Sequence, residues 1–274
     1  MIVDYHMHLR DRDEEAPDGR YSADAAERYV EQAAEAGVDE IGFSEHVYHF
    51  RATKRLWEIQ WMLDRCTDDL DEYVGAVQEA KRRRLPVKLG LEVDYFPGIE
   101  AELRELLDQY PWDFLLGSVH FVDGFGVDSE PSLTHKLPPA EAYRRYFVWL
   151  RNAARSDLFD VLSHPDLVKF FGRRADPETT HYIYEETADA AEAADVCVEI
   201  STKGLRVPAA ELYPHPDLLQ AFRSRGVPIT LASDAHVPTD VGRDIGDAVA
   251  LARSAGYETV TVFERRSRRQ EPLG

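Results

Sequence analysis

Cysteine, methionine and lysine are scarce in this chain of 274 residues, which contains two, three and six of them. The two cysteines, Cys66 and Cys197, lie far apart in the sequence, and we expect both thiols to be reduced. Cys197 falls in the middle of an apolar run and is expected to fill the core. The hydrophobic fraction of 44% is ample for a core, which excludes a largely disordered chain.

Long hydrophobic runs are also missing. No apolar stretch approaches the roughly 20 residues that a helix needs to span a bilayer. The sequence MIVDYHMHLR at the start of the chain has no basic segment followed by an apolar one, and so lacks the pattern of a signal peptide. We therefore expect a cytoplasmic protein with no membrane partner.

Positive charge is scarce relative to negative charge. Acidic residues outnumber basic ones by 51 to 32, which gives a formal net charge of −19. This sign disfavours nucleic acid as the main partner, because the phosphate backbone is itself anionic. Two interpretations of the acidic, lysine-poor surface stay open: adaptation to high salt, or an ordinary solvated surface. The composition also leaves a homo-oligomer open.

Three motifs that often mark phosphate-binding or nucleophilic sites are absent. The sequence contains no G-x-x-x-x-G-K-[ST] loop, no G-x-G-x-x-G after a predicted strand, and no G-x-S-x-G elbow. These absences disfavour a P-loop nucleotide hydrolase, a dinucleotide-binding enzyme and an esterase with a serine nucleophile.

Short apolar or β-branched runs alternate with longer amphipathic stretches along the chain. The runs predict strands over Ile2–His8, Glu40–Ser44, Val87–Asp94, Phe114–Val119, Asp160–Ser163, Val196–Ser201 and Pro228–Ser233. The stretches predict helices over Ala23–Ala36, Leu70–Arg84, Ile99–Gln109, Pro139–Arg155, Thr179–Ala194, Pro216–Arg225 and Asp240–Ala255. Such alternation over short connections favours parallel pairing, so we predict one closed or nearly closed α/β barrel. We expect a single domain over residues 1–264 and a polar, frayed tail over residues 265–274.

Six of the ten histidines fall at or just past the carboxyl end of a predicted strand. They are His6, His8, His46, His120, His164 and His236, and the two remaining strands carry Glu92 and Glu199. The carboxyl ends of barrel strands converge on one mouth, where barrel active sites are built. His6 and His8 are two residues apart, so both imidazoles project from the same side of a strand and can grip one ion. Asp234 and His236 repeat that spacing.

The joint placement of these side chains carries the inference, because a lone histidine is more often a surface or hydrogen-bonded core residue than a ligand. Six imidazoles with Asp234 and Glu92 suit zinc, manganese or iron, and they are too many for one ion. We therefore predict two or three divalent metal ions, with Glu92 able to bridge a pair through its two oxygens. The loops that carry His49 and His135 could also reach the mouth.

The order of the short motifs H-x-H, E-H, G-x-E, S-V-H, S-H-P and S-D-A-H resembles the polymerase-and-histidinol-phosphatase (PHP) family of metallophosphoesterases. The resemblance runs from His6 to His236 and so covers most of the chain. Longer strings resemble the histidinol-phosphatase branch and are more specific than the ligand pattern. They are GSVHFVDG (Gly117–Gly124), SHPDLVKFFG (Ser163–Gly172), EISTKGLR (Glu199–Arg206) and ELYP (Glu211–Pro214).

The resemblance implies a distorted TIM-like (β/α)7 barrel with three metal ions at the carboxyl-terminal ends of its strands. The implied ligands of the first ion are His6, His8, Glu92 and Asp234. Those of the second ion are Glu92, His120 and His164.

The third ion is the least completely liganded in this scheme. The resemblance assigns it His46 and His236, together with a residue six positions after the second histidine of H-x-H. That position is Glu14 here, where family members often have histidine or aspartate. Asp11 and Asp13 are the alternative ligands in the same acidic segment.

Metal-ion chemistry then implies phosphate ester hydrolysis without a covalent intermediate. Coordination lowers the pKa of water from 15.7 to roughly 7, so the expected nucleophile is a metal-bridging hydroxide. Glu92 and Asp234 are the predicted catalytic residues, because they would hold that hydroxide in place. The predicted substrate-binding residues are Arg206, Lys169, Glu199 and His49. For each of them, a structural or surface charge is the alternative role.

The implied reaction is the hydrolysis of L-histidinol phosphate to L-histidinol and phosphate in histidine biosynthesis. The chain would then be a phosphoric monoester hydrolase with a small-molecule substrate. One alternative is a PHP-type phosphoesterase acting on nucleotides or other small phosphate esters, although the acidic charge disfavours long nucleic acids. Another is a non-catalytic, metal-stabilised barrel that binds a partner, which the near-complete ligand set disfavours.

Overall fold

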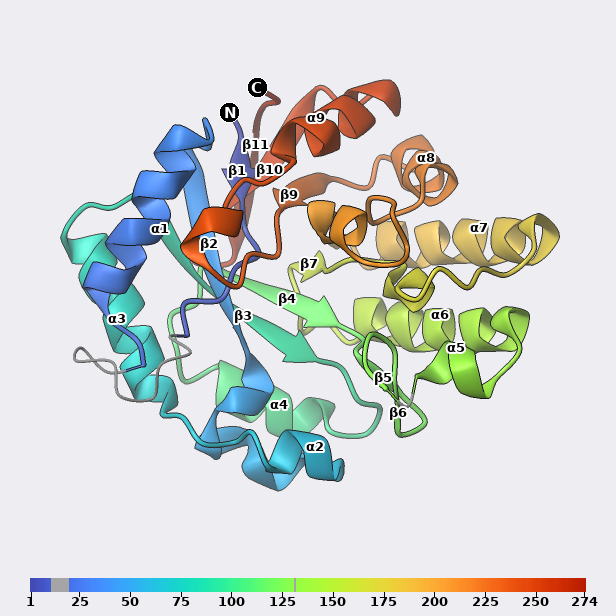
Figure 1. Ribbon diagram of the computed structural model, residues 1–274, viewed down its shortest axis with the longest axis horizontal. Coiled ribbons are helices and arrows are strands. Elements are labelled where there is room, and N and C mark those ends of the chain that lie inside the picture. Colours follow the sequence, from blue (N-terminus) through green and yellow to red (C-terminus); the bar gives the residue numbers. More distant parts are fainter. Residues whose placement is uncertain (11–19, 131) are drawn as a thin grey trace.

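Seven parallel strands form the central sheet in this computed structural model, which describes residues 1–10, 20–130 and 132–274. Along the sheet they are β1 (Val3–Asp4), β2 (Glu40–His46), β3 (Val87–Asp94), β4 (Phe114–Ser118), β7 (Val161–Leu162), β8 (Cys197–Ser201) and β9 (Ile229–Ala232). The two edges meet, because the N–H of Tyr5 donates to the carbonyl of Leu231 at 3.0 Å and Met7 bridges Ala235 in parallel. The sheet therefore closes into a barrel, which confirms the predicted fold (Figure 1).

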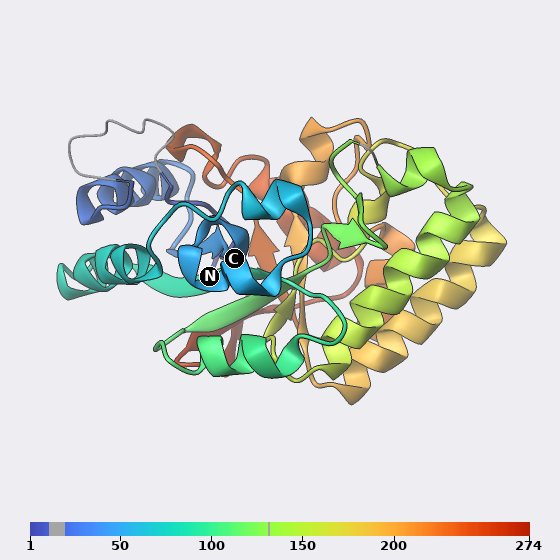
Figure 2. The same ribbon diagram turned by 90° about the horizontal axis from the view of Figure 1, so that it is seen from below.

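Longer helices surround the barrel close to their predicted positions. They are α1 (Ala23–Glu35), α3 (Leu70–Arg82), α4 (Glu100–Leu107), α6 (Pro139–Arg155), α7 (Pro177–Ala193), α8 (Pro216–Ser224) and α9 (Ile245–Ser254). The hydroxyl of Ser22 accepts from the N–H of Ala25 at 3.0 Å and so fixes the start of α1. Helices α6 and α7 pack together on one flank, and α1 and α3 on the other (Figure 2). Among the described residues, no helix combines the length and the apolar character that a membrane span requires.

Short elements gather in the loops that follow the barrel strands. After β2 come η1 (Val47–His49), η2 (Arg51–Leu56) and α2 (Gln60–Leu63). After β4 come the hairpin of β5 (Phe121–Val122) and β6 (Phe125–Gly126), and then α5 (Leu133–Lys136). After β7, β8 and β9 come η3 (Leu167–Lys169), η4 (Thr202–Arg206) and η5 (Pro238–Asp240). These loops build the rim of the barrel mouth.

Aromatic rings fill the barrel interior near its amino-terminal end. The ring of Phe114 stacks on Tyr5 with centroids 5.2 Å apart, and Phe263 lies 6.0 Å from Phe114. Two glycines on the neighbouring strands make room for this ring. A Cβ added at Gly42 or Gly90 would come within 2.7 Å or 2.3 Å of Phe114 carbons.

Replacing Gly90 by alanine is therefore expected to destabilise the fold by about 1–3 kcal/mol, the usual cost of overpacking a dense core. Chemical denaturation measures this change in the free energy of unfolding. Gly75→Ala is the matched control, because Gly75 lies in α3 and an added Cβ would meet nothing within 4 Å. The control should stabilise the protein slightly, since alanine favours helix by up to about 1 kcal/mol over glycine. Equal stability of both variants would contradict tight packing around Phe114.

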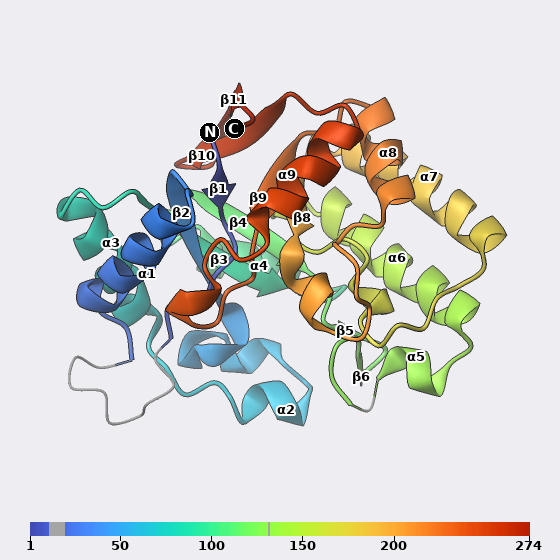
Figure 3. The ribbon, with the colours of Figure 1, turned by 45° about the horizontal axis from the view of Figure 1, so that its top comes forward.

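The carboxyl-terminal segment is ordered, and this corrects the expectation of a frayed tail. Strand β10 (Thr259–Glu264) pairs antiparallel with β11 (Ser267–Pro272). The hairpin lies at the end of the barrel where both termini are found (Figure 3). Strand β11 has no alternation of apolar and polar residues, so the sequence did not indicate a strand there. Backbone pairing with β10 and the ion pair of Arg266 with Asp160 at 2.8 Å hold the segment in place.

Both cysteines are free and buried, as expected. Burial raises the pKa of the Cys197 thiol to about 12. The group therefore stays a neutral thiol at physiological pH, which suits a core residue and not a nucleophile.

Candidate metal centre

The segment that carries the H-x-H motif is not a regular strand. Strand β1 ends at Asp4, which corrects the longer predicted strand, and only Met7 makes a further bridge, to Ala235. His6 and His8 flank Met7, so their side chains still project to the same side, with ring centroids 5.4 Å apart. The bridge between Met7 and Ala235, where the two edges of the sheet meet, thus holds His6 and His8 in the predicted arrangement.

Glu92 lies at the centre of the barrel mouth and is fully buried. Its Oε2 atom faces three imidazoles: it lies 3.2 Å from Nε2 of His6, 3.8 Å from Nε2 of His8 and 2.6 Å from Nδ1 of His46. These histidines come from the β1 segment and the end of β2, and Glu92 comes from β3.

The second oxygen of Glu92 faces two further imidazoles from the next strands of the barrel. Its Oε1 atom lies 3.3 Å from Nε2 of His120 and 3.1 Å from Nε2 of His164. The hydroxyl of Ser118 donates to the same oxygen at 2.7 Å and so helps to fix the carboxylate. With different imidazoles on each oxygen, Glu92 has the position of a residue that bridges two ions.

Asp234 and His236 close the ring of donor groups after β9. The Oδ1 atom of Asp234 lies 3.6 Å from Nε2 of His8 and 3.3 Å from Nδ1 of His236. The ring of His8 lies between those of His46 and His236, with centroids 4.0 Å and 4.2 Å away. The structure thus brings together all six histidines and both carboxylates that the sequence singled out.

These donors form overlapping groups whose ligand atoms lie within 4.8 Å of one another. The groups are His6, His8 and Glu92; His46, Glu92 and His120; His6, His164 and Asp234; and His8, His46 and His236. One ion has about four ligands when it is zinc, so eight donors in four such groups fit more than one ion.

Buried nitrogen and oxygen atoms without a hydrogen bond show whether metal cations fit this cluster of side chains. Several buried ligand atoms have no hydrogen bond among the described residues: His6 Nε2, His8 Nε2, His46 Nδ1, Glu92 Oε2 and Asp234 Oδ1. A native protein rarely leaves such atoms unsatisfied, because each costs about 1–3 kcal/mol. Coordination to cations would satisfy all five, so the donor set fits divalent metal ions.

Burial and charge oppose each other in this cluster. Burial alone would raise the pKa of Glu92, but the neighbouring imidazoles of His6 and His46 outweigh it and hold that pKa well below its usual range. Asp234 behaves in the same way, because Lys203 and His6 lower its pKa more than burial raises it. Both carboxylates are therefore anionic near neutral pH and available as ligands.

Glu199 lies behind the histidines and holds them in orientation. Its carboxylate accepts from Nδ1 of His6 at 2.9 Å and from the backbone N–H of His164 at 3.2 Å. The side chain is fully buried. Such a partner on the far ring nitrogen fixes the tautomer and leaves Nε2 for the metal. The substrate-binding role predicted for Glu199 stays a prediction, and its contacts are those of a supporting residue.

Two more carboxylates, Glu45 and Asp94, accept hydrogen bonds from other histidine rings and so orient them. The sequence did not identify them as supporting residues. Glu45 accepts from Nδ1 of His8 at 3.3 Å and from Nδ1 of His49 at 3.0 Å. Asp94 accepts from Nδ1 of His120 at 2.9 Å. The sequence feature that could have identified them is their position beside candidate ligands. Glu45 directly precedes His46 in β2, and Asp94 lies two residues after Glu92 in β3.

A cavity of about 260 Å³ opens onto the metal centre. Candidate ligands at or just after the ends of five strands (β2, β3, β4, β7 and β9) form its floor. The rest of its wall consists of Tyr48, Trp61, Phe121, Asp128, Ser129, Leu167, Phe170 and Lys203. This volume is just below the range of about 300–1,000 Å³ that is usual for small-molecule sites, and it suits a small metabolite.

The cations predicted to bind phosphate lie outside this wall. Arg206 donates to the carbonyl of Ser233 and pairs with Asp244 at 3.3 Å. Lys203, four residues after Glu199, does line the cavity, and its Nζ lies 3.6 Å from Oδ1 of Asp234. Among the described residues it is the one lysine or arginine in that wall. It was part of the string EISTKGLR but was not singled out.

Lys169 is fully buried, and its ammonium lies 2.8 Å from Asp166 and 2.7 Å from Glu211. We expect Lys169→Met to lower the free energy of unfolding by about 3–5 kcal/mol, because it strands the buried charge of Asp166. Lys136→Met, at an exposed lysine of α5, is the control and should change little. Denaturant unfolding gives the comparison. Unchanged stability with a raised KM would instead support the predicted phosphate contact.

The remaining predicted positions lie at or beyond the edge of the site. His49 lines a neighbouring hollow of about 420 Å³ together with His8 and His46. His135 pairs with Glu130 at 2.7 Å and is exposed. The third ion's last ligand was predicted to be Glu14, with Asp11 or Asp13 as alternatives, and all three lie outside the described residues.

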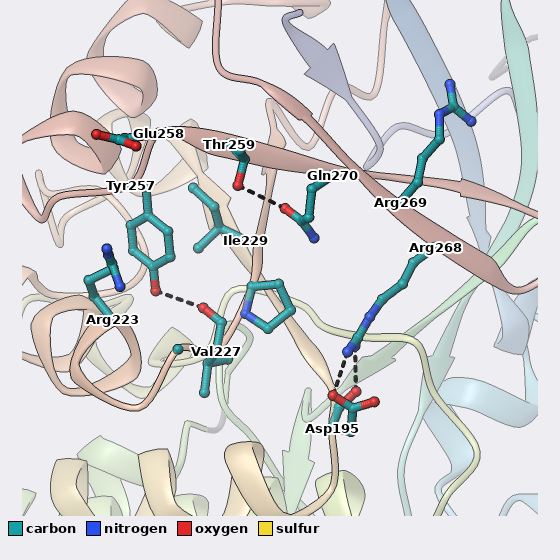
Figure 4. A pocket seen from close by; sticks show the side chains of 12 residues that line it. Asp195, Arg223, Val227, Ile229, Tyr257, Glu258, Thr259, Arg268, Arg269 and Gln270 are labelled. Atoms are coloured by element: carbon teal, nitrogen blue, oxygen red, sulfur yellow. Dashed lines mark hydrogen bonds and ion pairs between the residues drawn. The ribbon is translucent and has the colours of Figure 1, made fainter.

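A further hollow, of about 460 Å³, is lined by residues such as Asp195, Val227 and Tyr257 (Figure 4). It is rich in arginine, but these side chains have protein partners. Arg268 pairs with Asp195, and Arg223 donates to the carbonyl of Gly256 at 2.9 Å. The hollow adjoins the amino-terminal ends of β8 and β9, the end of a barrel that serves stability and not catalysis.

A closed α/β barrel with this donor set at its mouth defines a metal-binding barrel protein. The PHP domain matches residues 18–203. The chain belongs to the PHP domain family, which confirms the resemblance read from its motifs.

Similar proteins match the chain over nearly its whole length. A protein of Deinococcus radiodurans named a probable histidinol-phosphatase is 32% identical over 271 residues, which cover 97% of this chain and 98% of that protein. The histidinol-phosphatase of Lactococcus lactis is 25% identical over 274 residues, with coverage of 95% and 94%. A crystal structure of histidinol phosphate phosphatase from Lactococcus lactis, complexed with zinc, L-histidinol and phosphate, has a TM-score of 0.75 at 22% identity and covers 98% of each chain. This last likeness confirms the fold.

Proposed function

We propose that this chain is a histidinol-phosphatase, a phosphoric monoester hydrolase that converts L-histidinol phosphate to L-histidinol and phosphate in histidine biosynthesis. The observation that carries the proposal is the Glu92-centred cluster of imidazoles and carboxylates at the floor of one small cavity. Relatives with this name that match over nearly the full chain support it.

Two or three divalent ions, such as zinc, manganese or iron, would bind in the cluster. The residues that would hold them are His6, His8, His46, Glu92, His120, His164, Asp234 and His236, with Glu14 predicted as a further ligand. When bound, such ions supply an activated water near neutral pH and neutralise charge on the phosphoryl oxygens.

The chain's own side chains prepare the cavity for a phosphate monoester. Glu92 and Asp234 are held anionic, and the carboxylates behind the histidines fix the imidazole rings. Lys203 supplies a positive charge at the wall, where it would attract the phosphate dianion. We also propose that Arg206 and Lys169 contact the phosphate group of the substrate.

A phosphate-release assay on L-histidinol phosphate tests the assignment. We expect turnover by the metal-loaded protein and none after chelation, with nucleoside monophosphate and oligonucleotide as poor substrates. Strong activity on a nitrophenyl ester with none on L-histidinol phosphate would overturn the substrate and keep the metal site. Preference for a nucleoside monophosphate would favour the nucleotide-directed alternative.

We further propose that the protein acts in the cytoplasm on a small molecule, without nucleic acid as its main partner. The net charge of −19 supports the second point, since it repels polyanions. Size-exclusion chromatography with light scattering would measure the mass in solution and so test whether the protein forms the predicted homo-oligomer.

A further inference from the structure

The part of the cavity wall that lies beyond the metal ligands is largely aromatic. Tyr48, Trp61, Phe121 and Phe170 contribute to it. Tyr48 and Trp61 meet edge to face with centroids 5.1 Å apart, and Trp61 lies 5.6 Å from Phe121. Tyr48, Trp61 and Phe121 thus form a connected apolar surface that suits a flat ring or a short carbon chain, and Phe170 adds a further ring to the wall.

Asp128 lies in the same wall, and its carboxylate has no ion-pair or hydrogen-bond partner in the described part of the chain. The residue is partly buried. The other two carboxylates of the cavity, Glu92 and Asp234, face imidazoles of the metal centre. A partly buried carboxylate without a partner is unfavourable, so a cationic ligand would offset this cost.

The loop that carries Asp128 is fixed beside the metal centre. The backbone N–H of the preceding residue, Val127, donates to the carbonyl of His120 at 2.8 Å. Gly126 is required for the tight turn, because a Cβ there would lie 2.3 Å from Oγ of Ser129. The carboxylate is thus positioned by the backbone next to a metal ligand, and not left on a free loop.

The negative charge of Asp128 acts within the cavity. Asp128 lines the same cavity as Tyr48, Glu92 and Lys203. The cavity's positive charge, Lys203, belongs to a different loop, the one after β8. The wall therefore offers a cation beside Asp234 for an anionic group and a separate anion for a cationic group.

We propose that Asp128 binds the ammonium group of the substrate, with the aromatic wall packed against the remainder of the alcohol. This inference rests on the proposed function and names the residue that selects phosphate monoesters with an ammonium group. In L-histidinol phosphate the ammonium is on the carbon next to the one that bears the ester oxygen. An ester with its phosphate at the metal centre thus brings the ammonium and the imidazole ring to the surrounding wall.

The test replaces Asp128 by asparagine, which keeps the size of the side chain and removes its charge. Two pairs of esters are compared: L-histidinol phosphate with its analogue that lacks the amino group, and phosphoethanolamine with ethyl phosphate. We expect kcat/KM to fall about 10- to 100-fold for the ammonium-bearing esters, as a charge-assisted hydrogen bond is lost, and to be unchanged for their partners. Calorimetric titration with L-histidinol should show a matching loss of affinity.

Glu130→Gln is the matched control, because it removes one negative charge from the same loop at an exposed residue outside the cavity wall. Metal content and the thermal unfolding midpoint of Asp128→Asn should equal those of the wild type. An equal loss for both members of each ester pair, or no loss for either, would overturn the role of Asp128.

Failure of the proposed function gives a different result. The wild type would then turn over no L-histidinol phosphate, while the phosphoethanolamine pair would still report on Asp128. Wild-type protein that binds no amino alcohol in the calorimeter and hydrolyses no ammonium-bearing ester would overturn the inference itself.

Discussion

Replacing Glu92 by glutamine is expected to lower kcat/KM for phosphate release by more than about a thousandfold, equivalent to about 4 kcal/mol of transition-state stabilisation. Both oxygens of Glu92 face imidazoles, at 2.6 Å to His46 and 3.1 Å to His164. Glutamine puts an uncharged N–H2 group in place of one oxygen, so it removes the bridging anion while it keeps the shape. The metal content per chain should fall at the same time.

The control for this variant is Glu102→Gln, an exposed residue of α4. It removes the same charge without touching the barrel mouth, and its activity and metal content should match those of the wild type. Steady-state kinetics and elemental analysis of both proteins give the comparison. A Glu92→Gln protein that kept its ions and most of its activity would show that Glu92 is not the central ligand.

The positions of the strands and of the metal ligands could be predicted from sequence because both depend on local patterns. A buried parallel strand such as β4 (FLLGS) is a nearly continuous apolar run, and the residue that follows such a run is visible in the chain. Barrel closure then brings those ends together, whatever the loops do. This is why His120 and His164 could be assigned to one site although they lie 44 positions apart in the sequence.

Contacts between distant charges could not be predicted in this way. A carboxylate such as Asp94 looks the same in sequence whether it supports His120 or faces solvent, and only the fold decides between these roles. Lys169 has the sequence signature of a surface cation, but the fold buries it against Asp166. Strand β11 could not be predicted for a similar reason, because its stability comes from pairing with β10 and not from an apolar pattern of its own.

Removal of the metal ions by a chelator is the second large effect that we expect. Phosphate release should cease, and the midpoint of thermal unfolding should fall by roughly 5–10 °C. An ion present at a hundred times its Kd stabilises the folded state by about 2.7 kcal/mol, and each kcal/mol shifts the midpoint of a domain of this size by about 2–4 °C. The physical cause is the set of buried candidate ligand atoms, such as Nε2 of His6 and Oδ1 of Asp234, that make no hydrogen bond among the described residues.

Differential scanning calorimetry with and without chelator measures this shift, and adding zinc or manganese back should restore both the midpoint and the activity. The Glu92→Gln variant serves as an internal control, because a protein that has already lost its ions should show little further shift. Chelated wild-type protein that stayed active would rule out a metal-dependent reaction. Lost activity with an unchanged midpoint would mean that the hydrogen bonds behind the histidines, such as that from His6 to Glu199, hold the empty site together on their own.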